Sequence, residues 1–354
     1  AQAVRIAPAP ARIIPKSVAT PGLLAHVLTG KFVDHLPFYR QEKMFARLGV
    51  DIGRATLCNW AMQAATASLP LINLISDTIL ESRVINIDET TLQVLAEPGR
   101  EATAKSYMWV FRRGDPHRPA IIYQYHPTRA GDVARTFLGD FKGVIQTDGY
   151  SGYDFLDHRE EVRHAGCLAH VRRKFMDLIK AQGKNRPSGS ADQALAYIQQ
   201  LYGLEKQARQ RELSAEEILT MRRDHARPVM EHFHQWLCKR SGQTPPKGLL
   251  GKAISYTLNQ WDRLLVYLEE PLLTPDNNPA ENAIRPFVLG RKNWLFAGSL
   301  RAGQRMAAIL SLLETARLNG HAPYIWLRDV LTRLPTWPNS RISELLPYAE
   351  NSFS

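Results

Sequence analysis

Three acidic residues lie in segments where an ionised carboxylate is costly unless it has a partner. Asp88 interrupts the apolar alternation of VINIDET, Asp148 ends the apolar segment VIQTDGY, and Glu281 lies near the start of a helical pattern in DNNPAEN. Carboxylates on neighbouring buried strands repel each other unless a cation lies between them. Oxygen ligands of this kind favour Mg²⁺ or Mn²⁺, and two such ions promote phosphodiester chemistry. These residues therefore predict a carboxylate–metal site that acts on a polyanion.

Each acid also has an ordinary structural interpretation. Asp148 is followed by glycine, and Asp-Gly is a turn sequence by itself. If Asn278 is a helix N-cap and Pro279 the first helical residue, Glu281 completes a capping box with the Asn278 N–H. Glu281 and Arg285 also have the spacing of a helical ion pair. The sequence leaves these alternatives open.

A Cys-x-x-His pair, Cys167 and His170, lies in the segment HAGCLAHVRRKF. A tetrahedral zinc site needs four ligands; His164 could join, but Cys58 and Cys238 are isolated in sequence. We therefore do not expect zinc. We expect Cys167 to pack as a small apolar group at a strand end. His170 would then orient backbone or lie at the edge of the active site.

The charge balance favours an anionic partner. The chain has 45 Lys and Arg against 34 Asp and Glu, a formal net charge of +11. This excess attracts polyanions, with nucleic acid as the first partner class and an anionic membrane surface as the second. Basic residues lie beside aromatic ones in two segments, a pattern typical of nucleic-acid contacts. The alternative is a solvated basic helix face, and we expect Trp294 to be a core residue. The predicted DNA-contacting residues there are Arg172, Arg173, Lys174, Arg285, Arg291, Lys292 and Arg301.

A second candidate DNA-binding element lies over residues 38–65. Two apolar-periodic stretches are broken between Gly49 and Gly53, which is the outline of a helix-turn-helix. Base-contacting side chains in that motif start the second helix, where this chain has Arg54, Thr56 and Asn59. The alternative is an ordinary helical hairpin.

The elements that must position the acids are strands followed by helices. We predict strands over 82–95, 106–114, 119–126, 142–149 and 161–167, and a helix over 128–141. This order is that of a ribonuclease H-like mixed α/β core. We predict that residues 168–265 are helical, with breaks at 183–192 and 241–248 and no further strand pattern. The segment from Met306 to Val330 is also predicted to be helical.

Three distant cysteines predict a reducing compartment, and no apolar stretch is long enough for a membrane span. We expect a soluble, cytoplasmic protein. Residues 1–18 are rich in proline and predict a linker or arm. The sequence does not begin with Met, so the numbering could start inside a longer chain.

Four segments together resemble the insertion-sequence-66 family of transposases: IDETTLQVL, VIQTDGYSGYDFL, HAGCLAHVRRKFMDL and DNNPAENAIRPFVLGRKNWLFAGS. The resemblance extends from about Ile14 to the closing LPTWPNSRISELLP. It implies a DDE transposase in which Asp88, Asp148 and Glu281 are the catalytic and metal-binding triad. It also implies a ribonuclease H-like core enlarged by a helical insertion. Cys167 and His170 match a motif whose role looks structural or DNA-positioning.

The resemblance further implies cofactors and partners. Two Mg²⁺ ions, for which Mn²⁺ can substitute, would support cleavage at the transposon ends and attack of the freed 3′-OH on target DNA, without a covalent protein–DNA intermediate. The partners would be end and target DNA, a second copy of the chain or more, and helper proteins of the element, with the protein at the nucleoid. Family members carry a cysteine-rich, zinc-ribbon-like N-terminal region, whose cysteines are not in this sequence.

The predicted organisation follows from these observations. Its segments are 1–18, a linker or arm; 19–80, a helix-turn-helix-like DNA-binding segment; 81–182 and 266–335, the two parts of the core; 183–265, the helical insertion; and 336–354, a C-terminal element. Two alternatives to a transposase are an inactive DNA-binding remnant and a ribonuclease H-like nuclease without strand transfer. A glycosidase with paired carboxylates would leave the basic excess unused.

Overall fold

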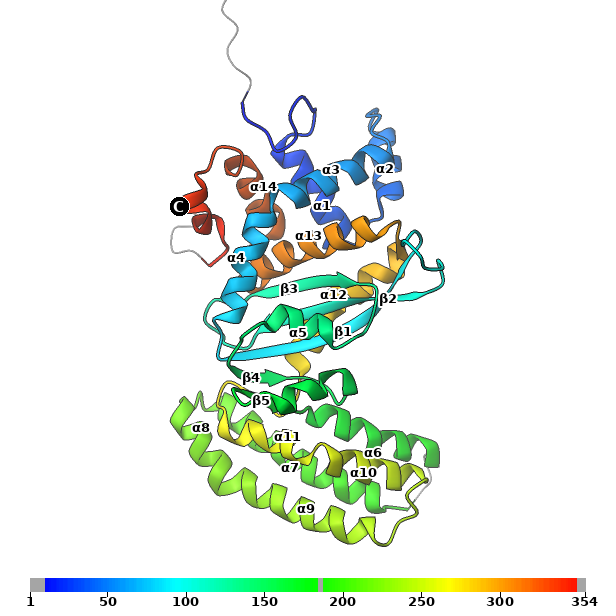
Figure 1. Ribbon diagram of the computed structural model, residues 1–354, viewed down its shortest axis with the longest axis vertical. Helices are drawn as coiled ribbons and strands as arrows, with labels where there is room; N and C mark the ends of the chain where they lie inside the picture. The colour runs from blue at the N-terminus through cyan, green and yellow to red at the C-terminus, as the bar shows by residue number, and fades with distance from the viewer. Residues whose placement is uncertain (1–9, 184–186, 349–354) are drawn as a thin grey trace, which may run out of the picture.

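The computed structural model describes residues 10–183 and 187–348. It is an elongated, mixed α/β structure with three parts along its long axis (Figure 1). Helices from both ends of the chain lie at one end, a twisted sheet lies in the middle, and a bundle of helices lies at the other end. The predicted N-terminal arm lies outside the described residues over 1–9, and residues 10–20 form no regular helix or strand.

The sheet has the strand order β3-β2-β1-β4-β5, and a short strand, β6, pairs with β1 off this path. β1 is the central strand, antiparallel to β2 and parallel to β4. All five predicted strands are confirmed. β6 is not predicted, because two residues are too few to show an alternation. The strands are β1 (Val84–Val94), β2 (Lys105–Arg113), β3 (Ile121–His126), β4 (Gly143–Gln146), β5 (Val162–Ala165) and β6 (Phe296–Ala297).

Helices cover a face and an edge of the sheet. The predicted helix α5 (Asp132–Leu138) joins β3 to β4, and its Phe137 stacks on Phe111 of β2 at 3.8 Å between ring centroids. The long helix α13 (Leu300–Leu318) lies against β3. Ser311 and Thr315 of α13 accept hydrogen bonds from backbone N–H groups of this edge strand. These hydroxyls satisfy an edge that would otherwise be open to other strands.

The N-terminal helices share one apolar core with the sheet and the C-terminal helices. The two helices of the predicted helix-turn-helix are present, and the turn between them contains Gly49 at a φ of 76°. The segment from Met306 to Val330 is helical, as predicted, and is divided between two helices, α13 and α14, at Gly320 with a φ of 78°. The remaining elements here are α1 (Pro21–Phe32), α2 (Phe38–Arg47), α3 (Arg54–Ala67), α4 (Leu69–Leu80), α14 (Pro323–Arg333) and η4 (Asn339–Leu345).

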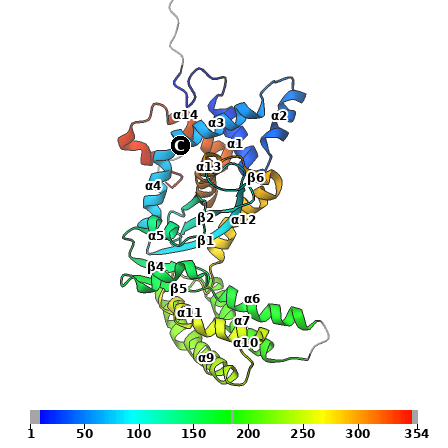
Figure 2. The same cartoon turned by 45° about the vertical axis from the view of Figure 1, so that its right-hand side comes forward.

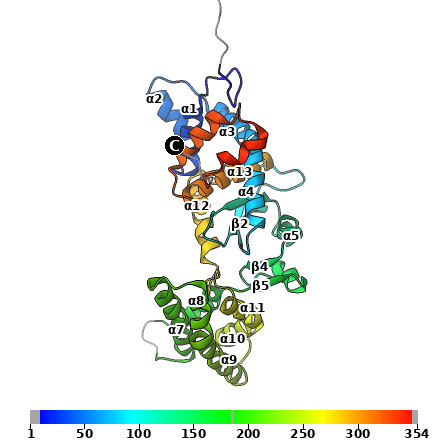
Figure 3. The same cartoon turned by 90° about the vertical axis from the view of Figure 1, so that its left-hand side faces the viewer.

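The region between β5 and α12 (Asn278–Trp294) is helical, as predicted, and has an apolar core of its own. A break over 211–214 is not predicted; it ends in a capping box formed by Ser214 and Glu217. Figures 2 and 3 show that α12 leads from this bundle back to the sheet. The elements of the bundle are α6 (Leu168–Gln182), α7 (Ser190–Gln210), α8 (Ala215–Met221), η2 (Arg222–Ala226), α9 (Arg227–Ser241), α10 (Leu249–Asn259), α11 (Trp261–Leu265) and η3 (Val266–Glu269).

Candidate active site

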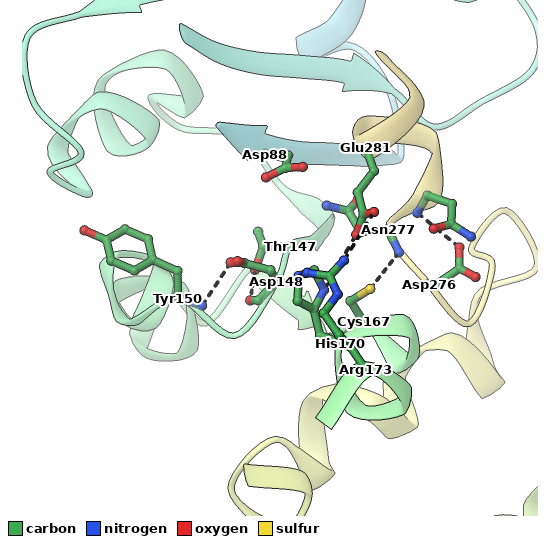
Figure 4. Close-up of polar contacts among 12 residues, drawn as sticks. Asp88, Thr147, Asp148, Tyr150, Cys167, His170, Arg173, Asp276, Asn277 and Glu281 are labelled. Atoms are coloured by element: carbon green, nitrogen blue, oxygen red, sulfur yellow. Dashed lines mark hydrogen bonds and ion pairs between the residues drawn. The ribbon is translucent and has the colours of Figure 1, made fainter. Parts of the chain in front are cut away.

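The sheet register brings Asp88 and Asp148 to the same level. β1 and β4 are parallel, with Asn86 opposite Gln146. Each aspartate stands two positions after its member of that pair, and side chains two apart in a strand point to the same face. Glu281 reaches this place from the first turn of α12. Figure 4 shows the three carboxylates around one space.

This arrangement destabilises the ionised form of the Asp88 carboxyl. Burial raises the pKa of its carboxyl well above the usual value, and the charge of Glu89 raises it further. Asp148 and Glu281 also raise the pKa of Asp88, so their charges lie close enough to repel it. One contact opposes these effects, since the Glu89 N–H donates to Asp88 Oδ1 at 2.8 Å. Negative charge therefore gathers here, and a cation would relieve it.

A network of buried amides holds the elements that carry the acids. Asn86 Nδ2 donates to Gln146 Oε1 at 2.9 Å and to Asn277 Oδ1 at 3.1 Å. Asn277 Nδ2 in turn donates to the backbone oxygen of Ile87 at 2.8 Å. The three amide residues are 3%, 0% and 1% exposed. None of the three was predicted from the sequence, although a polar side chain inside each of two apolar strands was a signal.

Cys167 joins this network to the helical bundle. Its Sγ accepts the Asn277 backbone N–H at 3.2 Å, and the Leu168 N–H donates to the Pro275 carbonyl at 2.9 Å. Cys167 is buried at the junction of β5 and α6, as the sequence predicted. The contact fixes the start of α6 against the start of α12. His164, considered as a further zinc ligand, instead lies 2.8 Å from Thr147 and 2.7 Å from Asp157.

The capping-box interpretation of Glu281 is wrong. The N-cap of α12 is Asn277 rather than Asn278, and the Asn278 N–H donates to Asp276 Oδ1. Glu281 points instead at α6 (Figure 4). Its Oε1 lies 3.7 Å from His170 Nδ1, and its Oε2 lies 3.8 Å from an Arg173 nitrogen. The carboxylate is therefore turned toward the site rather than back along its own helix.

The turn interpretation of Asp148 is right in part. Asp148 Oδ1 accepts the Tyr150 N–H at 2.9 Å, which is the local bond expected of aspartate in a turn. Glycine at position 149 is explained by packing and not by the turn. A Cβ at Gly149 would lie 2.5 Å from the Tyr256 hydroxyl, so the close approach of α10 requires glycine here. Tyr256 thus brings the helical bundle against the loop that carries Asp148.

A second polar group lies beside the carboxylates and was also missed. Glu89 is buried, bonds to Arg129 and accepts a hydrogen bond from the Tyr153 hydroxyl. The Arg129 guanidinium stacks on Tyr150 at 3.7 Å and reaches within 4.0 Å of Asp148 Oδ2. Arg129 is therefore a cation held between two acids at the edge of the site. The position of Glu89, directly after Asp88, was the available signal.

The predicted DNA-contacting residues are placed on the surface with one partial exception. All are exposed except Arg291, which is half-buried and bonds to Thr91 of β1. Trp294 is a core residue, as expected. A groove beside Glu281 is lined by Arg172, Arg173 and Lys180. Arg54, Thr56 and Asn59 are exposed on α3, on the far side of the sheet from that groove (Figure 1).

None of the described helices is long and apolar enough to cross a membrane.

The fold and site define an α/β protein built around a cluster of carboxylates, and comparison with known proteins gives its family. Residues 16–305 match the IS66 family of transposases, and residues 311–348 match the IS66 C-terminal element. The chain belongs to the IS66 transposase family.

Three relatives are uncharacterized proteins of Sinorhizobium fredii (strain NBRC 101917 / NGR234). The chain is 34% identical to y4jD over 97% of its own length and 68% of the relative. It is 34% identical to y4qI over 96% of its own length and 64% of that relative. It is 32% identical to y4hP over 98% of its own length and 65% of that relative. The chain thus spans about two thirds of the length of these relatives.

Proposed function

We propose that this chain is the catalytic part of a DDE transposase, which cleaves the ends of an insertion sequence and joins them to target DNA. The observation that carries the proposal is the β1–β4 register, which sets Asp88 level with Asp148 where α12 delivers Glu281. The strand order β3-β2-β1-β4-β5 supports a ribonuclease H-like core. Family membership supports the reaction class.

The residues present fit divalent metal ions. Three carboxylates converge, and burial, followed by the charges of Glu89, Asp148 and Glu281, raises the pKa of Asp88. Asp88, Asp148 and Glu281 would hold two Mg²⁺ ions, or Mn²⁺ in their place, because hard oxygen donors suit these cations. When bound, the ions supply activation of the attacking oxygen and stabilisation of the leaving oxygen.

The remaining residues position the acids and the DNA. The amide network of Asn86, Gln146 and Asn277 holds the three carboxylate-bearing elements together. Arg172 and Lys180 line the groove that opens beside Glu281, where they would contact phosphates. The exposed residues of α3 would bind DNA separately from the groove.

Cleavage at two transposon ends suggests at least a dimer on DNA, with target DNA and helper proteins as further partners. The protein would act in the cytoplasm, at the nucleoid. These statements concern the whole protein, of which the chain matches about two thirds.

Formation of joined donor–target DNA tests the proposal. The chain is incubated with labelled transposon-end DNA, supercoiled target and Mg²⁺, and products are separated on denaturing gels. A transposase gives nicked ends and joined products. Nicks without joined products would identify a nuclease, and DNA binding without nicks would identify an inactive remnant; either result overturns the proposal.

A further inference from the structure

We propose that Cys167, His170 and Glu281 form a second metal site, which shares Glu281 with the carboxylate site and takes a borderline transition-metal ion, with Zn²⁺ as the best match. The three donors come from the β5–α6 junction, the first turn of α6 and the first turn of α12. In the sequence, too few zinc ligands lie close together along the chain. The fold adds Glu281, which lies far downstream in sequence.

The donor atoms are already close together. Cys167 Sγ, the His170 ring nitrogen and a Glu281 carboxylate oxygen all lie within 4.8 Å of one another. His170 Nδ1 and Glu281 Oε1 are 3.7 Å apart. Ligand atoms of a tetrahedral zinc site are roughly 3.5 Å apart, given bonds of about 2.0–2.3 Å. Small side-chain rotations would therefore complete the site, and Figure 4 shows the side chains facing one another.

Two of the donor atoms are buried and unsatisfied. Within the described residues, His170 Nδ1 and Glu281 Oε1 have no hydrogen-bond partner. A buried polar group without a partner destabilises the fold. A bound cation would satisfy both atoms at once, whereas their separation of 3.7 Å is too long for a hydrogen bond between them.

Backbone N–H groups close to the Cys167 sulfur favour its thiolate form. The Asn277 N–H donates to Cys167 Sγ at 3.2 Å. The His170 N–H donates to the Cys167 carbonyl and lowers the pKa of the nearby thiol, against the effect of burial. Such N–H groups stabilise a thiolate ligand, and metal binding deprotonates a thiol that burial otherwise keeps protonated.

The donor set favours a different metal from that of the carboxylate site, although the two sites share Glu281. Thiolate, imidazole and carboxylate together suit Zn²⁺, whereas Mg²⁺ prefers oxygen donors alone. Three protein ligands leave a fourth position for water. Arg173 neutralises Glu281 without the metal, but its side chain is 56% exposed and can move away.

Occupancy would bind Glu281 to α6 and withdraw it from Asp88 and Asp148. Zn²⁺ would therefore inhibit Mg²⁺-dependent cleavage; this consequence, unlike metal binding itself, rests on the proposed function.

The test uses Co²⁺ and Zn²⁺ on the full chain without DNA, in a background of Cys58→Ser and Cys238→Ser. Both replaced cysteines are exposed, and Cys238 forms an exposed pair with His234 at 3.8 Å that could bind metal adventitiously. We expect one equivalent of Co²⁺ with a thiolate-to-cobalt absorption band, displaced by Zn²⁺. Cys167→Ser should abolish the band, and His170→Gln should weaken binding at least roughly 10-fold.

Circular dichroism melting shows whether each variant is folded. If Cys167→Ser is unfolded, metal binding by His170→Gln tests the proposal instead. No stoichiometric metal in the background protein, or a thiolate band unchanged by both variants, would overturn the proposal. Because this measurement needs no DNA, its failure leaves the transposase proposal intact. In cleavage assays, Zn²⁺ should inhibit the background protein more than Cys167→Ser, each relative to its own zinc-free rate.

Discussion

The side chain of Asn86 donates a hydrogen bond to the side chain of Asn277, 191 positions away in the sequence, inside the protein. Asn86 stands two residues before Asp88 in a strand, and Asn277 stands one helical turn before Glu281. Gln146, the third amide, stands two residues before Asp148. Each acid thus follows an amide at the spacing that puts both side chains on the same side of their element, two residues along a strand or one turn along a helix. Bonding among the amides consequently places the carboxylates next to one another.

Replacing Asn277 with alanine should separate these elements. The Asn86 amide and the Ile87 carbonyl lose a partner, which costs about 1–3 kcal/mol of unfolding free energy. We also expect the cleavage rate at saturating DNA to fall roughly 10–100-fold, as for loss of a supporting contact. Urea unfolding and single-turnover cleavage measure the two effects.

DNA affinity should stay unchanged in Asn277→Ala, because the amide is buried. Asn282→Ala, an exposed asparagine in the same helix, is the matched control and should leave stability and rate near the wild-type values. Equal rates for the two variants would contradict a positioning role for Asn277.

The sequence predicts the five longer strands well because each strand alternates or is continuously apolar over several residues. It does not predict the amide network, because the partners of Asn86 lie in two other elements. The N-cap of α12 is misplaced by one residue for a related reason. Asn277 and Asn278 are equally good caps locally, and the contact with Asn86 selects Asn277. Likewise, His170 and Glu281 become neighbours only through the tertiary fold.

Arg222 should be essential to the helical bundle. It is 1% exposed, pairs with Glu205 at 2.8 Å, and donates to the carbonyls of Tyr267, Glu270 and Leu273, in the segment that leads to α12. Arg222→Met leaves the Glu205 charge buried without its partner, so we expect a loss of about 3–5 kcal/mol. Thermal melting measures it. Exposed Arg211→Met is the control, and similar melting of both variants would contradict this role.

His164 should make stability depend on pH. Burial, and then the charge of Arg263, lowers its pKa to about 4. The unfolded chain therefore binds a proton on His164 before the folded chain does, and unfolding free energy falls as pH drops from about 6.5 to 4. The full effect is up to about 3 kcal/mol.

Urea unfolding at several pH values checks this for wild type and His164→Gln. The variant lacks the titrating group and should show a smaller slope in that window, while exposed His158→Gln should keep the wild-type slope. An identical slope in His164→Gln would exclude His164 as the source.

Arg172 should contribute one phosphate contact. It is exposed in the groove beside Glu281 and has no ion pair with any residue that the structure describes. Arg172→Ala should reduce the slope of log Kd against log salt concentration by about 1. Lys239→Ala, at an exposed position of α9 far from α12, is the charge-matched control and should leave the slope unchanged. Equal slopes in the two variants would remove Arg172 from the DNA path.

The most direct test of the carboxylate site is Mg²⁺-dependent cleavage of transposon-end DNA by Asp88→Asn. We expect a loss on the order of 10³-fold with unchanged DNA affinity, because the substitution removes a charge from the reacting centre but none from the basic surface. Asp132→Asn, at a side chain that is 85% exposed, should cleave like the wild type. Cleavage by Asp88→Asn at the rate of Asp132→Asn would contradict the account.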